Sequence, residues 1–134
     1  MTKGDSFVLD THAFIWGLTE PQRLGEAARE VMSARENRLL VSAASAWEIA
    51  TKFRLGKLPG AGFIVHNFEG FVAKLGAQTL EISSSHALLG GSFDWGHRDP
   101  FDRMLAAQAL IEGHRFISCD AVFRDLPGLK VVWD

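Results

Sequence analysis

Several carboxylates stand where an α/β sheet would bring them together. Asp10 and Asp120 each directly follow a short apolar, β-prone run, and Glu48 lies in the second turn of the helical stretch that follows another such run. Ligands of parallel α/β sheets bind beyond the carboxyl ends of the strands. If these carboxylates converge, each raises the free energy of ionising its neighbours, so the cluster must take up protons or bind cations.

Two further aspartates open the clearest helix of the chain. Asp99-Pro100 offers an N-cap and a proline at the first helical position, Asp102 falls in the first turn, and the apolar periodicity continues to Gly113. The sequence does not say which aspartate would face a metal. A structural reading stands beside the functional one, because Asp99 and Asp120 also suit helix caps and Asp102 suits the positive end of a helix dipole.

The donor types favour a hard divalent cation. The single cysteine, Cys119, excludes a multi-cysteine zinc cluster. The histidines show no zinc-protease spacing and are expected at the surface or in ordinary hydrogen bonds; those considered are His12, His86, His97 and His114. Oxygen ligands favour Mg²⁺ or Mn²⁺, which can lower the pKa of an attacking water and stabilise charge on a phosphodiester under cleavage.

Polar neighbours could support such a site. The hydroxyls of Thr11 and Ser118 are expected to orient a carboxylate or a metal-bound water, with strand-end capping as the alternative. Lys52 is spaced to form an ordinary helix salt bridge with Glu48. A group of basic residues could form a rim that contacts a nucleic-acid backbone, with solvated surface charge as the alternative. These residues are Lys52, Arg54, Lys57, Arg98 and Arg103. Candidates for base stacking, with packing as the alternative, are Trp16, Trp47 and Trp95.

Alternating elements must position these residues. The β-prone runs are Ser6–Leu9, Leu39–Ser42, Gln78–Ile82, Arg115–Ser118 and Lys130–Val132. The helical patterns cover Glu26–Glu36, Ala44–Leu55, Phe63–Leu75, Ser84–Leu89 and the stretch from Asp99 to Gly113, and Gly90-Gly91-Ser92 is expected to be a flexible loop. This alternation predicts a parallel α/β sheet, with residues 1–134 forming one domain.

Composition narrows the class of protein. The chain has 134 residues, is 47% hydrophobic and carries a net charge of −2, so no global positive field draws it to nucleic acid or to anionic membranes. It has no apolar run near the roughly 20 residues that span a bilayer. It also shows no basic-then-apolar leader and no glycine-rich nucleotide motif. These features predict a soluble cytoplasmic protein, and one cysteine suits a reducing compartment.

Four ordered blocks resemble the PIN-domain ribonucleases, and most closely the VapC toxins of bacterial type II toxin–antitoxin pairs. The resemblance covers essentially the whole chain. The blocks are Leu9–His12, Val41–Ile49 followed by Lys52 and Gly56–Leu58, Asp99–Ala109, and Ile117–Asp120.

The resemblance implies a fold, an activity and partners. It implies a three-layer α/β/α sandwich with a mainly parallel sheet of four to five strands. It also implies a Mg²⁺- or Mn²⁺-dependent endoribonuclease that acts on RNA, forms a homodimer and is held inactive by a VapB-type antitoxin whose C-terminal segment enters the active-site groove. The matching acidic quartet is Asp10, Glu48, Asp102 and Asp120, with Asp99 as an auxiliary metal ligand. Cys119 departs from the pattern of many relatives.

Two other functions remain as alternatives. In the first, the acidic pocket only receives a basic partner segment, with no turnover. In the second, the chain is a small-molecule phosphatase with an aspartyl nucleophile. The second is disfavoured, because Asp10-Thr11-His12 lacks the additional aspartate two residues on that acid–base catalysis would use.

Overall fold

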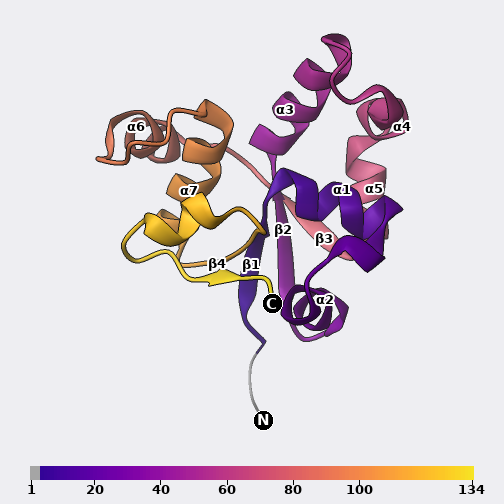
Figure 1. Cartoon of the computed structure of the whole chain (residues 1–134), viewed down its shortest axis with the longest axis horizontal. Helices are drawn as coiled ribbons and strands as arrows, with labels where there is room; N and C mark the ends of the chain where they lie inside the picture. Colours follow the sequence, from indigo (N-terminus) through magenta and orange to yellow (C-terminus); the bar gives the residue numbers. More distant parts are fainter. Residues whose placement is uncertain (1–3) are drawn as a thin grey trace.

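The computed structural model describes residues 4–134, which form a five-stranded sheet with helices on both sides (Figure 1). Every pairing is parallel and the strand order is β3-β2-β1-β4-β5. The strands are β1 (Ser6–Leu9), β2 (Arg38–Ser42), β3 (Ala77–Leu80), β4 (Arg115–Ile117) and β5 (Val131–Val132). The predicted α/β fold with a parallel sheet is therefore confirmed, with strand bounds that differ from the expected runs by at most two residues.

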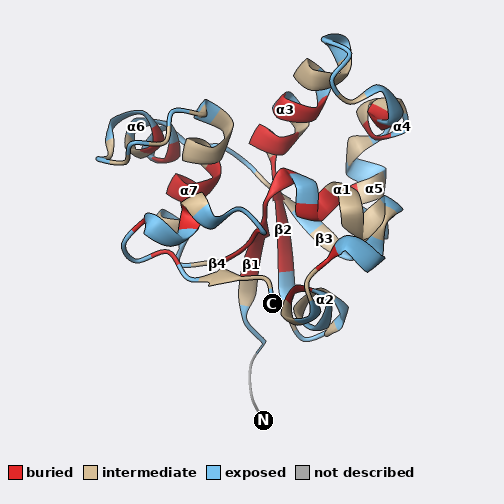
Figure 2. Ribbon diagram, in the orientation of Figure 1, coloured by how far each residue is buried: buried red, intermediate tan, exposed pale blue. Residues whose placement is uncertain are grey.

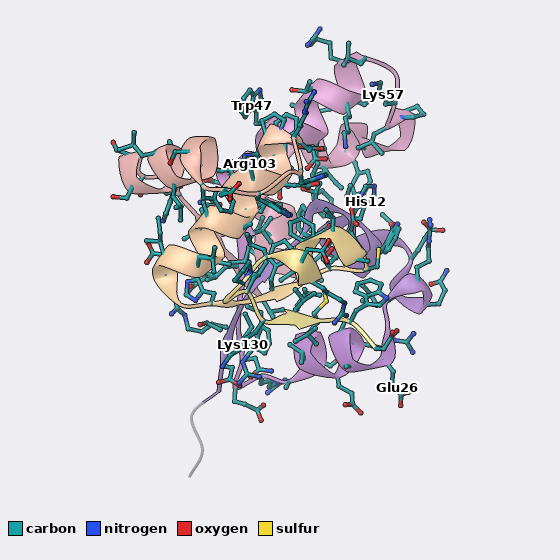
Figure 3. All side chains as sticks on the ribbon, turned by 60° about the vertical axis from the view of Figure 1, so that its left-hand side comes forward. His12, Glu26, Trp47, Lys57, Arg103 and Lys130 are labelled. Atoms are coloured by element: carbon teal, nitrogen blue, oxygen red, sulfur yellow. The ribbon has the colours of Figure 1, made fainter. Side chains whose placement is uncertain are left out.

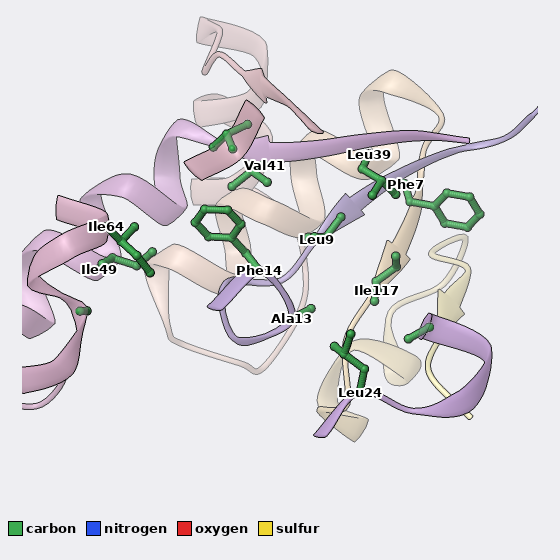
Figure 4. Packing of buried hydrophobic residues seen from close by; sticks show 13 residues of the cluster. Phe7, Leu9, Ala13, Phe14, Leu24, Leu39, Val41, Ile49, Ile64 and Ile117 are labelled. Atoms are coloured by element: carbon green, nitrogen blue, oxygen red, sulfur yellow. The ribbon is translucent and has the colours of Figure 1, made fainter. Parts of the chain in front are cut away.

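Side chains that alternate along β1 divide the interior into two cores. Leu9 lies in one cluster with Phe14 and Ile49, which come from helices of the first half of the chain (Figure 4). Its neighbour Val8 lies in the other cluster with Leu105 and Phe116. Because successive residues of a strand point to opposite faces, a strand buried on both faces has to be apolar throughout. This explains the buried centre of the sheet (Figure 2).

Helices cover both faces of the sheet. Those of the first half are α1 (Thr11–Thr19), α2 (Glu26–Ser33), α3 (Ala43–Arg54), α4 (Gly62–His66) and α5 (Phe68–Lys74). Those of the second half are α6 (Ser84–Ser92) and α7 (Pro100–Glu112), and 3₁₀ turns form at Pro21–Arg23, Pro59–Ala61 and Ala121–Asp125. None of the helices within residues 4–134 combines the length and the apolar character needed to cross a membrane.

The predicted helix Phe63–Leu75 is interrupted. Asn67, with φ −153° and ψ 53°, separates α4 from α5. Its side chain folds over Gly70, where a Cβ would lie only 2.4 Å from the Asn67 Nδ2 atom. The missing side chain at Gly70 therefore leaves the room that this break requires.

The expected flexible loop at Gly90-Gly91-Ser92 is wrong, because these residues form the last turn of α6. Gly90 is buried against α7, and a Cβ there would lie 3.3 Å from the carbonyl oxygen of Arg103. The Gly90 carbonyl accepts a hydrogen bond of 2.8 Å from Nε of Arg103. The glycine therefore allows two helices to approach closely, and it does not mark a loop.

A matched pair of glycine substitutions tests this contact. Gly90→Val should lower the free energy of unfolding by about 1 to 3 kcal/mol, because the new side chain overpacks the α6–α7 interface. Gly91→Val is the control, since a Cβ at Gly91 meets nothing within 4 Å. Urea denaturation measures both, and equal stabilities would contradict the close approach.

Candidate active site

All five carboxylates singled out in the sequence line one cavity of about 470 Å³ at the carboxyl ends of the strands; they are Asp10, Glu48, Asp99, Asp102 and Asp120. They come from the end of β1, from α3, from the start of α7 and from the segment after β4. The parallel pairing of Leu9 with Ile117 explains part of this convergence, because the residues that follow the two strands emerge side by side.

Asp10 combines a structural and a site role. One carboxylate oxygen accepts a hydrogen bond of 2.7 Å from the backbone N–H of His12 and so caps α1. The other accepts a short hydrogen bond from the Ser118 hydroxyl. The side chain is buried, and this burial raises the pKa of the carboxyl above its ordinary value of 3.8, against the effect of the hydrogen bonds. Capping and site formation thus coincide at this residue.

Glu48 is buried in the cavity wall with both oxygens engaged. Its Oε1 accepts a hydrogen bond of 2.6 Å from Thr11, and its Oε2 accepts one from the Lys52 ammonium. Burial acts to lower the pKa of Lys52, but the bond to Glu48 and the nearby acidic charges outweigh burial, so the net pKa is raised. The salt bridge considered from the sequence therefore exists, and Glu48 still lines the cavity.

The two aspartates of α7 have different surroundings. Asp99 Oδ1 caps the helix by accepting bonds of 2.8 Å and 3.3 Å from the N–H groups of Phe101 and Asp102. Asp102 Oδ2 lies 2.7 Å from Nε2 of His97. Burial, together with the charges of Asp99, Asp10 and Glu48, raises the pKa of Asp102 to about 6, although the contact with His97 lowers it.

His97 is a site residue that the sequence analysis did not identify. One ligand atom from each of His97, Asp99 and Asp102 lies within 4.8 Å of the others, as in a metal-binding group. The expectation of an ordinary hydrogen-bonded histidine describes its contact with Asp102 but not its place in the cavity. Its spacing, two residues before Asp99 and five before Asp102, is the only sequence signal that points to it.

Ser118 links the two strand-end aspartates. Its hydroxyl donates to Asp10 and accepts a hydrogen bond of 3.0 Å from the backbone N–H of Asp120. Asp120 caps the 3₁₀ turn that follows, through a bond of 3.0 Å from Val122. Between them, Cys119 lines the cavity, and burial and the charges of Asp10 and Asp120 raise the pKa of its thiol. The thiol is therefore kept in its protonated form at neutral pH.

Of the expected basic rim, Lys52 lines the acidic cavity. Lys57 lies beyond the end of α3 (Figure 3), beside a separate groove. Arg98 and Arg103 border a small cavity that Trp47 also lines. Arg103 has a different role from the expected one. Its guanidinium donates to the carbonyl of Gly90 in the last turn of α6 and to those of Phe93, Trp95 and His97 in the α6–α7 connection. This arginine holds the segment that carries His97.

Comparison with known proteins identifies the architecture. The sequence matches the family model of the PIN domain over residues 7–129. No curated protein matches the chain. It is similar, with a TM-score of 0.67 and 13% identity over 96% of this chain and 99% of the other, to a chain in the crystal structure of VapBC2 from Rickettsia felis bound to a DNA fragment from their promoter. A second similar chain, with a TM-score of 0.66 and 18% identity over 96% of this chain and 97% of the other, is from DNA-bound VapBC of Salmonella typhimurium.

The raised pKa of Asp102 predicts a pH-dependent effect on stability. A carboxyl whose pKa is 3.8 when unfolded and about 6 when folded destabilises the fold progressively as the pH rises through that interval. Asp102→Asn should therefore raise the free energy of unfolding by about 1 to 2 kcal/mol at pH 7 in chelator-treated buffer, and by much less at pH 4. The exposed Asp125→Asn is the control. A gain that does not depend on pH would contradict the assignment.

Proposed function

The chain belongs to the PIN-domain family, and from that premise we propose that it is a VapC-like toxin, a Mg²⁺- or Mn²⁺-dependent endoribonuclease that hydrolyses RNA phosphodiester bonds. The observation that carries the proposal is that five carboxylates from four separate segments of the chain line one cavity. The fold likeness to chains of VapBC complexes supports the toxin assignment. We also propose that residues 1–134 act as a single domain.

The donor set fits a hard divalent cation. Carboxylate oxygens are the ligands that Mg²⁺ and Mn²⁺ prefer, and burial together with mutual repulsion makes an ionised cluster costly without a cation. Asp10 and Asp102, whose pKa values are raised, are the residues where this cost is greatest. We propose the ligand set Asp10, Glu48, Asp99, Asp102 and Asp120, joined by His97. A bound ion would supply a water of lowered pKa and positive charge against the phosphate oxygens.

The surrounding residues fix the orientation of these carboxylates. Ser118 holds Asp10, Thr11 holds Glu48 and His97 holds Asp102, each through a hydrogen bond to one carboxylate oxygen. Such bonds restrict the rotation of a ligand side chain and are commonly needed for metal affinity. The chain thus holds preoriented acidic groups that would bind the ion beside the scissile phosphate. Lys52, which borders the same cavity, is the cationic residue best placed to meet a phosphate oxygen.

A VapB-type antitoxin is the proposed partner. A basic side chain of its C-terminal segment would enter the acidic cavity, in the way that the Lys52 ammonium already meets Glu48. We further propose a homodimer that acts in the cytoplasm, where RNA and antitoxin are both encountered.

A binding module without turnover is the second candidate. The contact between Lys52 and Glu48 favours it, since it demonstrates that a basic group can satisfy part of the acidic wall without a metal. Calorimetric titration with Mn²⁺ separates the two functions. A nuclease should bind the ion at micromolar concentrations and lose this binding in Asp102→Asn, whereas a peptide receptor need not bind it.

Substitution of single carboxylates tests catalysis. Asp10→Asn and Asp102→Asn should each lower the rate of RNA cleavage at least about 100-fold, because the loss of about 3 kcal/mol of transition-state stabilisation has that effect. Circular dichroism should remain that of the folded protein. Asp125→Asn, an exposed carboxyl outside the cavity, is the matched control. Full activity in either cavity variant would remove that residue from the proposed site.

Expression in bacteria tests the toxin assignment. The wild-type chain should arrest growth, and Asp102→Asn should not, because arrest depends on cleavage. If a short reading frame directly upstream of the gene encodes the antitoxin, its co-expression should restore growth. Arrest by Asp102→Asn at equal expression would show that toxicity has another cause.

A further inference from the structure

One side of the acidic cavity is aromatic. His12 and Trp16 both line it, and they lie one helical turn apart on α1, with ring centroids 5.5 Å apart and planes inclined by 47°. Arg23, in the 3₁₀ turn that follows α1, places its guanidinium carbon 4.2 Å from the centroid of the Trp16 ring. We refer to His12, Trp16 and Arg23 together as the α1 ledge.

Packing explains only part of this arrangement. Trp16 is held from behind by Trp133, whose ring centroid is 6.0 Å away, and its indole belongs to the partly buried edge of the core. His12 is exposed, although its chain neighbours Thr11 and Ala13 are buried. Packing against the core therefore holds Trp16 in place, while the imidazole ring of His12 is accessible to a ligand in the cavity.

The charge of the ledge complements a polyanion. The Arg23 side chain is 52% exposed, and its ion pair with Glu20 at 3.3 Å is a surface pair of the kind that contributes little. The acidic cavity thus has Lys52 on one wall and an arginine-backed aromatic surface on another. A strand of nucleic acid that brings a phosphate to the carboxylates would bring a neighbouring base and phosphate to this wall.

We propose that the α1 ledge binds one unpaired RNA base beside the scissile phosphate. The base stacks on the imidazole of His12, Trp16 supports this ring from below, and Arg23 meets an adjacent phosphate. This inference rests on the proposed function, because it takes RNA as the substrate. Stacking on an aromatic surface requires a base that is free of its duplex partners, and it accepts any base type. The ledge therefore selects single-stranded segments such as loops and not a base sequence.

Binding measured without cleavage tests the ledge. The probe is a fluorescent, unstructured ten-nucleotide RNA, titrated with the full chain in Ca²⁺ buffer, with gels to confirm that the RNA remains intact. His12→Ala should raise the Kd about 5- to 20-fold, in line with the loss of one stacked base. His12→Phe should bind like the wild type, because it keeps an aromatic ring. His66→Ala, an exposed histidine that does not line the cavity, is the control.

A series of RNAs with one abasic nucleotide gives a sharper test. One abasic position should weaken wild-type binding by a similar factor and should have almost no further effect in His12→Ala, because the two changes remove the same contact. Additive effects at every position would overturn the proposal, as would a Kd of His12→Ala equal to that of His66→Ala. Thermal unfolding of each variant verifies that the fold is retained.

The outcomes separate this inference from the proposed function. If the wild type cleaves RNA and His12→Ala binds as tightly as the wild type, the ledge fails and the nuclease assignment stands. If RNA binds through His12 but no condition gives cleavage, the ledge stands and the nuclease assignment fails. If the wild type binds no RNA, both fail.

Discussion

The repulsion among carboxylates held together in a partly buried cavity is the constraint on which the rest of this structure depends. Burial raises the pKa of Asp10, and burial with neighbouring charge raises that of Asp102. Each is nevertheless held by a donor, Ser118 in one case and His97 in the other. For the stability of the fold alone, these carboxylates would be better placed far apart, because their mutual repulsion would then be lost. Their concentration at one edge of the sheet is the feature on which the proposed cation site rests.

The parallel sheet gives this concentration at low structural cost. Where a helix or turn begins at the cavity, the same aspartate can accept a bond from the first free N–H groups and still face the cavity. Asp10, Asp99 and Asp120 are all used in this way. The positive end of each helix dipole also offsets part of the negative charge. The structural and functional readings of a capping aspartate are therefore compatible in this fold.

The second half of the site depends on how α6 and α7 pack. Arg103 donates hydrogen bonds to backbone carbonyls of the last turn of α6 and of the segment that connects α6 to α7. The absence of a side chain at Gly90 lets the two helices approach closely. A buried hydrogen bond from Ser42 at the end of β2 to Gln108 joins α7 to the sheet. These contacts set where His97 and Asp102 stand relative to the carboxylates of the first half.

The sequence by itself was enough to predict the parallel α/β architecture and to single out the five carboxylates that line the cavity. Both depend on apolar runs and helix caps, which are patterns within a few neighbouring residues. Only the tertiary structure decided that His97 joins the site, that Arg103 supports a loop and that Gly90 lies inside a helix. The place of His97 depends on how the segment before α7 folds back onto the first turn of that helix. The contacts of Arg103 and Gly90 form only when α6 and α7 pack against each other. The spacing of these residues along the chain does not fix either arrangement.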